Sequence, residues 1–512
     1  MTGDSSFLNL SACLGPQTRI NMKCNAALLS GRKYFWPRAI ILLALLPGCR
    51  EGDIRPGRAP ETRMSYDTIN LTGNNRLNTT VRLSWYGTDE DGYVKGFDVS
   101  QDGESWDFTT RQDSTFSFDI PAGNDRVDID FYVRAVDNSG QKDPSPAYLQ
   151  VPLRNSPPEA FFIDERGPQD TAFVAATFFW RAQDPDGDNS LAEVQLRANE
   201  GPWTTVNLGE PLLSLVPVRE SSSGPIDAQV FYGTNTSPSS TILKGLRIND
   251  TNRLQLRAID IAGKVSPVDT SPAFYFRGKT PGVDMLWING HNGGIRSEYQ
   301  TYLEAAGLNY DLYDLGGDQG AKIPAYFDPT VQLVFKEYQT AFLNLSNTSY
   351  SNPVTGVSST LLDFLAPVVQ RFTDRGGKYF LTTSFPKDAD VSNAVGVYPF
   401  SGLVLSSQPG SQARITTDSA LVPINNSNYP RLAPSNVEFG IVPIEASSDA
   451  QSFYRAQLTK FRGWNGSTDL MATVRRPSNQ LTEVFFAQEL HRYDSDPNRL
   501  QQLIGDIFKN EF

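Results

Sequence analysis

The chain has 512 residues, of which 39% are hydrophobic and 20% charged, and its formal net charge at pH 7 is −12. This length predicts roughly two to four domains, each large enough to bury its own core, and the composition argues against wholesale disorder. Nucleic acids and anionic membrane surfaces are polyanions, so the acidic balance works against non-specific binding to either. We expect no nucleic-acid partner.

Cysteine and histidine are both scarce. The cysteines are Cys13, Cys24 and Cys49, and the histidines are His291 and His491. A mature chain that starts at Cys49 can form no intrachain disulfide, no cysteine-ligated zinc site and no cysteine nucleophile. Two histidines cannot build a three-histidine zinc site, and they leave little room for histidine-based acid–base chemistry.

The first 48 residues have the pattern of a secretory signal. Basic residues precede an apolar run, Ala39–Leu46, that is too short to span a bilayer as a helix. The segment Leu46–Cys49 (LPGC) resembles the bacterial lipobox, whose cysteine is lipidated and becomes the new N-terminus. The resemblance implies a lipoprotein signal peptide that starts at Met1 or Met22, and a lipid anchor at Cys49. An ordinary signal peptide with an incidental cysteine is the alternative.

Residues 49–64 are polar, contain Pro and Gly and lack periodicity, which predicts a flexible tether. Arg50 to Asp53 resemble the sorting signals of Bacteroidetes-type surface lipoproteins. Without the leader the chain has 40 basic and 56 acidic residues, a net charge of −16. We expect an outer-membrane lipoprotein of the cell envelope, periplasmic or surface-exposed, that meets the membrane through its lipid.

Residues 65–154 alternate apolar and polar positions in short runs separated by turn residues, which predicts a β-sandwich. The predicted strands include Val81–Trp85, Val94–Val99 and Asp128–Val136. The same pattern recurs over residues 155–278, where Phe178–Gly187 repeats the Trp and Asp-Gly spacing of Leu83–Gly92. Internal repetition of this kind predicts a second, related module.

The two modules resemble the fibronectin type III and Ig-like repeats of bacterial surface proteins. Asn155–Pro158 is the predicted hinge between them, and the second module has an insertion near residues 208–240. Asp184, Asp186 and Asp188 offer oxygen atoms that could bind calcium, although the Gly and Glu of an EF-hand loop are missing. Because Asp-Pro-Asp-Gly is also a common turn sequence, a turn without any metal is the first expectation and calcium the alternative.

Residues 281–512 change from alternating strands to alternating strands and helices, which predicts a three-layer α/β domain. An insertion is expected near residues 386–480, with strands at Val395–Phe400 and Leu470–Val474. The other predicted strands are Val283–Asn289, Tyr310–Leu315, Thr330–Phe335, Lys378–Thr383 and Thr482–Leu490, and the predicted helices are Ile295–Ala306, Leu361–Thr373 and Pro497–Lys509.

This order resembles flavodoxin-like and class I glutamine amidotransferase-like domains, which implies their fold for residues 281–512. That family's glutaminases place a cysteine on a tight turn after a central strand. Here the corresponding strand continues into Thr383–Pro386, which contains no cysteine, so glutaminase activity is not implied.

Two candidate sites remain in this domain. Ser384, His491 and Asp494 could form a serine triad, although a turn-capping Ser384 and a surface His491 would explain the same residues. His291 follows the first strand, at the edge where open α/β sheets bind ligands. The predicted crevice there consists of Asn289, His291, Asn292 and Gly293.

These observations predict a lipid-anchored, non-enzymatic binding or scaffold protein, in which β-sandwich spacers present a degenerate α/β domain to a glycan or an envelope protein. An envelope or extracellular hydrolase that uses Ser384 and His491, or His291, is the alternative. A purely structural envelope component is a third reading.

Overall fold

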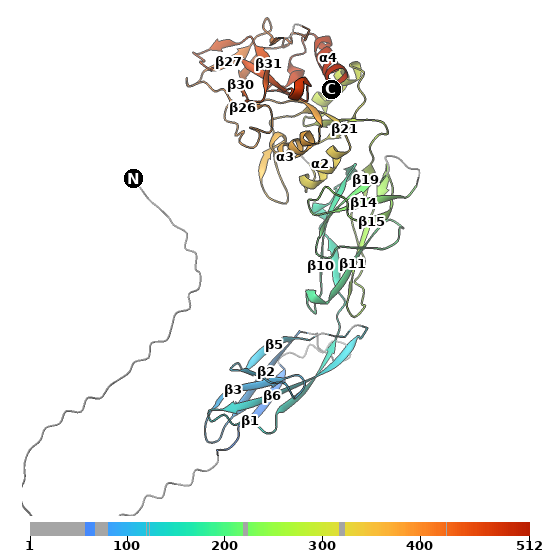
Figure 1. The fold of residues 1–512 in the computed structure, drawn as a ribbon, viewed down its shortest axis with the longest axis vertical. Helices are drawn as coiled ribbons and strands as arrows, with labels where there is room; N and C mark the ends of the chain where they lie inside the picture. Colours follow the sequence, from blue (N-terminus) through green and yellow to red (C-terminus); the bar gives the residue numbers. More distant parts are fainter. Residues whose placement is uncertain are drawn as a thin grey trace, which may run out of the picture. The chain divides into compact units, whose positions relative to one another are not determined.

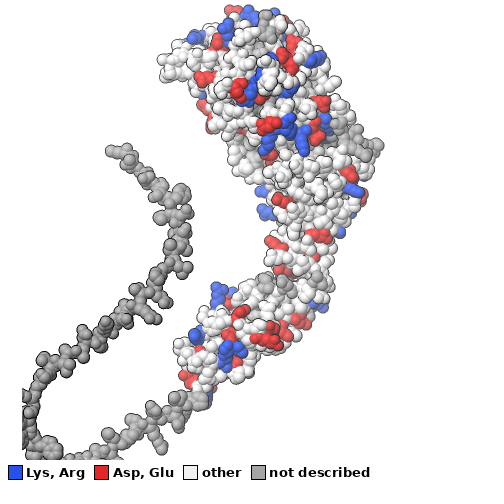
Figure 2. Space-filling model, viewed as in Figure 1, with Lys and Arg blue, Asp and Glu red and all other residues white. Residues whose placement is uncertain are grey.

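The computed structural model describes residues 57–66, 80–118, 120–121, 123–218, 224–316, 323–425 and 428–512. The predicted signal peptide and the lipidation site at Cys49 lie outside these residues. Among the described helices, none is long and apolar enough to cross a membrane. On the face drawn in Figure 2, acidic and basic side chains are interspersed.

The first module is a β-sandwich of two antiparallel sheets, as the alternating pattern predicts (Figure 1). Its core contains Leu83, Trp85, Phe131 and Val133, from strands on both sheets. The strands of one sheet are β1 (Glu61–Tyr66), β2 (Thr80–Thr88) and β5 (Asp113–Ser117), and those of the other are β3 (Val94–Ser100), β4 (Asp107–Thr109), β6 (Arg126–Asp137) and β7 (Ala147–Arg154).

β1 begins inside the stretch that we expected to be part of the tether. The hydroxyl of Thr62 accepts a hydrogen bond from the Ala135 amide at 2.7 Å, and the Thr62 amide donates to the Asp143 carboxylate at 2.7 Å. These partners lie more than 70 residues away, so local sequence gave no sign of the strand.

The second module is also a β-sandwich, with its core centred on Phe178, Trp180, Leu196 and Leu256. One sheet contains β8 (Glu159–Phe162), β10 (Ala176–Gln183), β13 (Leu212–Pro217), β14 (Ile226–Tyr232) and β15 (Ile242–Leu246), a second contains β11 (Leu191–Ala198), β12 (Thr204–Val206), β17 (Leu254–Asp260) and β18 (Asp269–Thr270), and a third contains β9 (Thr171–Phe173), β16 (Asp250–Asn252) and β19 (Phe274–Arg277).

The predicted insertion near residues 208–240 contains the antiparallel strand pair β13 and β14. β13 pairs with β10, so the insertion extends a sheet of the module and does not form a separate loop. This strand pair carries two buried apolar side chains, Val216 and Phe231, that belong to the core of the C-terminal domain.

The C-terminal domain is built on an eight-stranded mixed sheet. Five neighbouring strands are parallel, in the order β21-β20-β22-β25-β34, and three antiparallel strands continue the sheet. In sheet order these strands are β21 (Asp311–Asp314), β20 (Met285–Asn289), β22 (Thr340–Asn344), β25 (Lys378–Thr382), β34 (Glu483–Phe486), β33 (Leu470–Arg475), β31 (Gln451–Ala456) and β28 (Leu421–Pro423).

Helices alternate with the parallel strands along the chain. The side chain of Asn292 caps the first helix, and Thr360 and Asp363 form a capping box at the third. The helices are α1 (Gly293–Ala305), α2 (Phe327–Lys336), α3 (Leu361–Asp374) and α4 (Pro497–Asp506), and α4 ends in a π-helical turn, Ile507–Glu511.

The predicted strand at Thr330–Phe335 is wrong, because these residues lie in α2. Residues 329–335 are all buried, since α2 packs against α3 on one side and against the second module on another. A short continuous apolar run does not distinguish a buried helix from a buried strand. The strand that completes this part of the sheet is β22, five residues further along.

Residues 386–480 form a mixed β region, within which the predicted strand at Leu470–Val474 is present as β33. Most of the predicted strand at Val395–Phe400 is irregular, and β26 begins only at Phe400. The short strands outside the main sheet are β23 (Ser349–Ser351), β24 (Ser358–Thr360), β26 (Phe400–Leu403), β27 (Gln412–Ile415), β29 (Glu438–Ile441), β30 (Ile444–Ala446) and β32 (Thr459–Phe461).

Candidate functional site

A cluster of polar side chains lies beyond the carboxyl ends of the parallel strands. His291 follows β20, Ser384 follows β25, and Glu489 and His491 follow β34. Because parallel strands end at the same edge of a sheet, segments far apart in the sequence meet here. We call His291, Ser384, Glu489 and His491 the edge cluster.

The turn that carries His291 is held by buried amide side chains. Asn289 donates one hydrogen bond to the His291 carbonyl at 2.9 Å and another to the Asp314 carboxylate at 2.8 Å. Its own carbonyl oxygen accepts from the Asn344 amide at 2.7 Å. A Cβ atom on Gly316 would lie 2.1 Å from the His291 carbonyl oxygen, so only glycine fits at that position. The backbone at His291 is therefore closely fixed.

The His291 side chain is buried, with 6% of its surface exposed. Its Nε2 atom has no hydrogen-bond partner among the described residues. The centre of its ring lies 5.4 Å from that of His491. Burial lowers the pKa of His291, although the nearby Glu489 carboxylate raises it in part.

Glu489 is the carboxylate of the edge cluster, and 5% of its surface is exposed. One oxygen accepts a hydrogen bond from the Ser384 hydroxyl at 2.8 Å, and the other accepts from Arg492 Nε at 2.9 Å. Burial raises the pKa of Glu489, but the Ser384 hydrogen bond and the charges of His291 and Arg492 outweigh it and leave the pKa lowered. Glu489 is thus an ionised carboxylate at neutral pH.

His491 lies beside this carboxylate, with its Nε2 atom 3.8 Å from Glu489 Oε2. Its side chain is 10% exposed, and its Nδ1 atom has no hydrogen-bond partner among the described residues. The His491 backbone amide donates to the Tyr299 hydroxyl at 3.1 Å, which ties this turn to α1. Burial lowers the pKa of His491 to about 4, so the ring is neutral at pH 7.

The structure therefore brings together three of the residues singled out in the sequence, His291, Ser384 and His491. Asp494 has a different partner: it accepts a hydrogen bond from Ser435 at 2.5 Å. Ser384 donates to Glu489, a residue that sequence reasoning missed. The signal that could have found it is the sequence Glu489-Leu-His491 directly after the last parallel strand.

Several polar groups of the predicted crevice already have partners within the protein. The Asn292 side chain accepts from the backbone amides of Gly294 and Ile295, so these two donors at the start of α1 already have a partner. The Asn289 amide is likewise engaged within the turn.

The three aspartates of the second module form a turn. The Asp186 amide donates to the Asp184 carboxylate at 2.8 Å, and Gly187 has a positive φ of 111°. Among the described residues, the set of three or more potential metal ligands whose atoms approach within 4.8 Å consists of His291, Glu489 and His491, and does not include Asp184, Asp186 and Asp188. Calcium binding at these aspartates stays a prediction.

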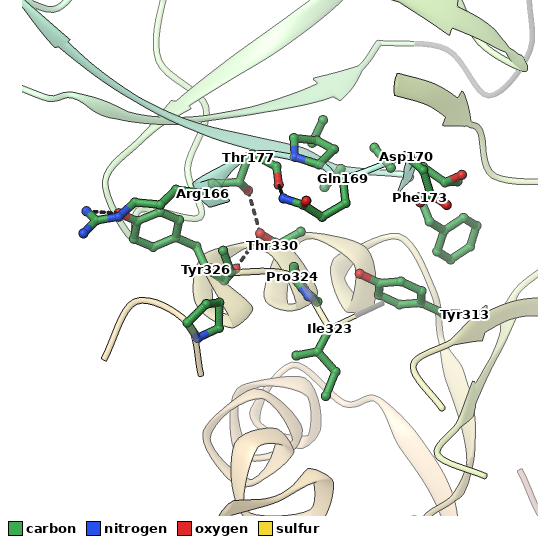
Figure 3. Close-up of a pocket in the computed structure, with 18 of the residues that line it drawn as sticks. Arg166, Gln169, Asp170, Phe173, Thr177, Tyr313, Ile323, Pro324, Tyr326 and Thr330 are labelled. Carbon is green, nitrogen blue, oxygen red and sulfur yellow. Dashed lines mark hydrogen bonds between the residues drawn. The ribbon is translucent and has the colours of Figure 1, made fainter. Parts of the chain in front are cut away.

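A separate cavity of about 540 Å³ lies where the second module meets the C-terminal domain (Figure 3). None of its lining residues belongs to the edge cluster. Thr177 of β10 and Thr330 of α2 share a hydrogen bond at 2.6 Å, and the Arg166 guanidinium donates to the Tyr326 hydroxyl at 3.3 Å. We call this cavity the boundary pocket.

No protein-family model and no curated protein sequence matches the chain. Among solved structures, the fibronectin(III)-like modules of Clostridium thermocellum CbhA align with 42% of this chain and 94% of theirs, at 10% identity and a TM-score of 0.16. A putative GMP synthase protein from Thermoplasma acidophilum aligns with 44% of this chain and 94% of its own, at 9% identity and a TM-score of 0.25.

The carbohydrate deacetylase Agd3 aligns over 44% of this chain and 32% of its own length, at 12% identity and a TM-score of 0.24. At these scores the likenesses carry no argument about activity. The Ig-like and fibronectin-like character of the two sandwiches rests on their own sheets and cores.

Proposed function

We propose that this protein is a hydrolase of the cell envelope, tethered by a lipid at Cys49, with its active site at the edge cluster. The observation that carries the proposal is the 2.8 Å hydrogen bond from the Ser384 hydroxyl to the Glu489 carboxylate, next to two buried imidazoles. A hydroxyl, a carboxylate that accepts its proton and adjacent imidazoles are the groups that hydrolysis of esters, amides and glycosides uses.

The proposal includes a three-layer α/β fold for residues 281–512, of the flavodoxin-like and amidotransferase-like kind. In chain order, the five parallel strands of the sheet have the order 2-1-3-4-5, which is that of flavodoxin-like sheets. α2 packs on α3 through Phe335 and Phe372, and α1 packs on α4 near Ala306 and Gly505. In such folds ligands bind beyond the carboxyl ends of the strands, where the edge cluster lies.

The test is a panel of ester, amide and glycoside substrates presented to the full chain and to Ser384→Ala, Glu489→Gln and His491→Ala. We expect turnover of one substrate class by the wild type and a loss of about 100-fold or more in each variant. Ser435→Ala is the matched control, because Ser435 is an exposed serine nearby whose partner is Asp494. Unchanged turnover in all three variants would contradict the proposal.

The second candidate function is non-enzymatic binding of a glycan or an envelope protein, and the boundary pocket favours it. Its volume of about 540 Å³ lies within the roughly 300–1,000 Å³ of small-molecule sites, which often form between domains. The aromatic rings of Phe173, Tyr313 and Tyr326 and the polar groups of Arg166 and Gln169 line it, a combination that suits a sugar.

Calorimetric titration with oligosaccharides tests this candidate. We expect heat of binding in the wild type and its loss in Arg166→Ala. Arg181→Ala is the control, because Arg181 is an exposed arginine of the same module that does not line the pocket. A chain that shows neither turnover nor binding would fit the third reading, a structural envelope component.

A further inference from the structure

The edge cluster has a second property that the hydrolase proposal does not use. His291, Glu489 and His491 each offer one potential ligand atom, and these atoms all lie within 4.8 Å of one another. They come from two turns nearly 200 residues apart in the chain, so the fold and not the local sequence brings them together.

Each of the two imidazoles has one buried nitrogen atom without a partner, and on His491 it is not the nitrogen that lies 3.8 Å from Glu489 Oε2. His291 Nε2 and His491 Nδ1 have no hydrogen-bond partner among the described residues, although buried polar atoms nearly always have one. The backbone at both histidines is held in place, by the turn around Asn289 and by the Tyr299 hydroxyl at the His491 amide. Imidazoles that have free nitrogens and are carried on a fixed backbone can serve as metal ligands.

We propose that His291, His491 and Glu489 bind one divalent first-row transition metal ion, with Zn²⁺ the ion that best matches two imidazoles and a carboxylate. Three protein ligands of this kind are typical of catalytic zinc sites, which leave a further position for water or substrate. The same set suits Fe²⁺, so the test includes both ions. Two histidines cannot form a three-histidine site, but here the Glu489 carboxylate supplies the third ligand.

Binding requires only side-chain movement. Ligand atoms around a tetrahedral zinc ion lie roughly 3.3 Å apart, so those now within 4.8 Å must close by rotation of their side chains. Arg492, which donates to Glu489, has a second carboxylate partner in Glu438 at 3.2 Å and can therefore release Glu489 oxygen to the ion. The charge of Arg492 opposes cation binding, and the carboxylates of Glu438 and Glu489 offset it.

Ser384 then acts as a positioning residue. Its hydroxyl donates to Glu489 Oε1 at 2.8 Å, and the other oxygen of that carboxylate, which also accepts from Arg492, lies 3.8 Å from His491 Nε2. Hydrogen-bonding partners behind metal ligands orient them, and their loss typically lowers metal affinity by about 10–100-fold. This inference concerns the site of the proposed hydrolase, but it does not depend on hydrolysis, because metal binding is measured directly.

The experiment uses the full chain, stripped with a chelator and then titrated with Zn²⁺, Fe²⁺ under anaerobic conditions, and Co²⁺ as a spectroscopic probe. We expect one ion per chain by elemental analysis, a rise in the thermal unfolding temperature on addition of Zn²⁺, and visible Co²⁺ bands of a site with nitrogen ligands. His291→Ala, His491→Ala and Glu489→Gln are expected to lose more affinity than the about 10–100-fold expected for Ser384→Ala.

Asp494→Asn is the matched control, since Asp494 is a neighbouring carboxylate outside the ligand set whose partner is Ser435, and it is expected to keep the one-ion stoichiometry. Circular dichroism of each variant without metal shows whether the variant is folded. If a histidine variant does not fold, the near-isosteric Glu489→Gln still tests the ligand set. A wild type that retains no ion, or Glu489→Gln with unchanged affinity, overturns the inference. If the chain binds one ion but turns over no substrate, the metal site stands and the proposed hydrolase function is rejected. If the metal-free chain turns over substrate and added metal does not change the rate, the hydrolase function stands and the metal site is rejected.

Discussion

The two β-sandwich modules share a sequence pattern, but only the second contributes side chains to the core of the C-terminal domain. In the first, Arg134 lies over the ring of Trp106 at 3.9 Å, and in the second the matching Arg257 lies over Trp203 at 4.3 Å. The core of the first module is a cluster of its own. The second module has its own core too, but also adds apolar residues, among them Phe231, to the core of the C-terminal domain.

The difference lies beyond β13, which pairs with β10 as β5 pairs with β2 in the first module. β14 and β15 continue this sheet and have no counterpart in the matching sheet among the described strands of the first module, and β10 and β13 contact α2, where Thr177 and Thr330 are hydrogen-bonded. One repeat is thus a separate unit, and the other is a structural part of the domain that carries the edge cluster. The comparison shows that added strands can make a β-sandwich module part of the core of the neighbouring domain.

The largest expected effect comes from the core tryptophans of the two modules. Trp85→Ala and Trp180→Ala each remove a side chain that is 2% exposed, which should cost about 3–5 kcal/mol of unfolding free energy. We expect unfolding in urea, monitored by fluorescence, to show two transitions. Trp85→Ala should lower only the transition of the first module, whereas Trp180→Ala should lower the one that the C-terminal domain shares. Independent transitions for all three domains would break the comparison.

Truncation of Phe231 tests the shared core directly. Phe231→Ala should destabilise the second module and the C-terminal domain together by about 3 kcal/mol, because its ring is 2% exposed within the core of that domain. Calorimetric scans of this variant should show one shifted peak, with the peak of the first module unchanged. Phe131→Ala, in the first module, is the counterpart and should shift only the other peak.

A smaller effect is expected at the hydrogen bond across the boundary. Thr177→Val keeps the side-chain shape but leaves the Thr330 and Ser214 hydroxyls without this partner, at a cost of about 1–3 kcal/mol. Hydrogen exchange should then increase in α2 and β13 and stay unchanged in the first module. Thr115→Val is a suitable control, because Thr115 is exposed on β5 of the first module.

The smallest expected effect concerns the feature that the modules share. Arg134→Ala and Arg257→Ala each remove a cation–π contact worth about 0.5–1 kcal/mol. Arg134 also pairs with Asp98 at 3.1 Å, whereas Arg257 donates to the neutral Gln195 at 2.8 Å. We therefore expect a slightly larger loss for Arg134→Ala, read from urea midpoints. An equal or opposite order would mean that this ion pair contributes nothing.

Prediction from the sequence succeeded where the pattern is local. The alternation in Asp128–Val136 and the Asp-Gly turns are enough to predict β6 and its repeat β17, because side chains on opposite faces of a strand must alternate. The predicted helices Leu361–Thr373 and Pro497–Lys509 are likewise present, as α3 and as α4 with its π-helical turn.

Prediction failed where distant contacts decide. α2 reads as a strand because residues 329–335 are all buried, in part by the second module, and so short a buried run does not distinguish a helix from a strand. β1 was hidden because its stabilising partners, Ala135 and Asp143, are far away in the sequence. Glu489 was overlooked because its partner Ser384 is 105 residues away in the sequence, so only its place after the last parallel strand pointed to it.

By itself, the sequence determined the acidic balance, the confinement of cysteine to the first 49 residues, the repeated sandwich pattern and the alternation of strands and helices that follows it. These properties depend on composition and on neighbours within a few residues. Only the tertiary structure decided that His291, Ser384, Glu489 and His491 meet, because parallel strands separated by long connections end at one edge of a sheet. The candidate site is a product of strand order, which local sequence does not encode.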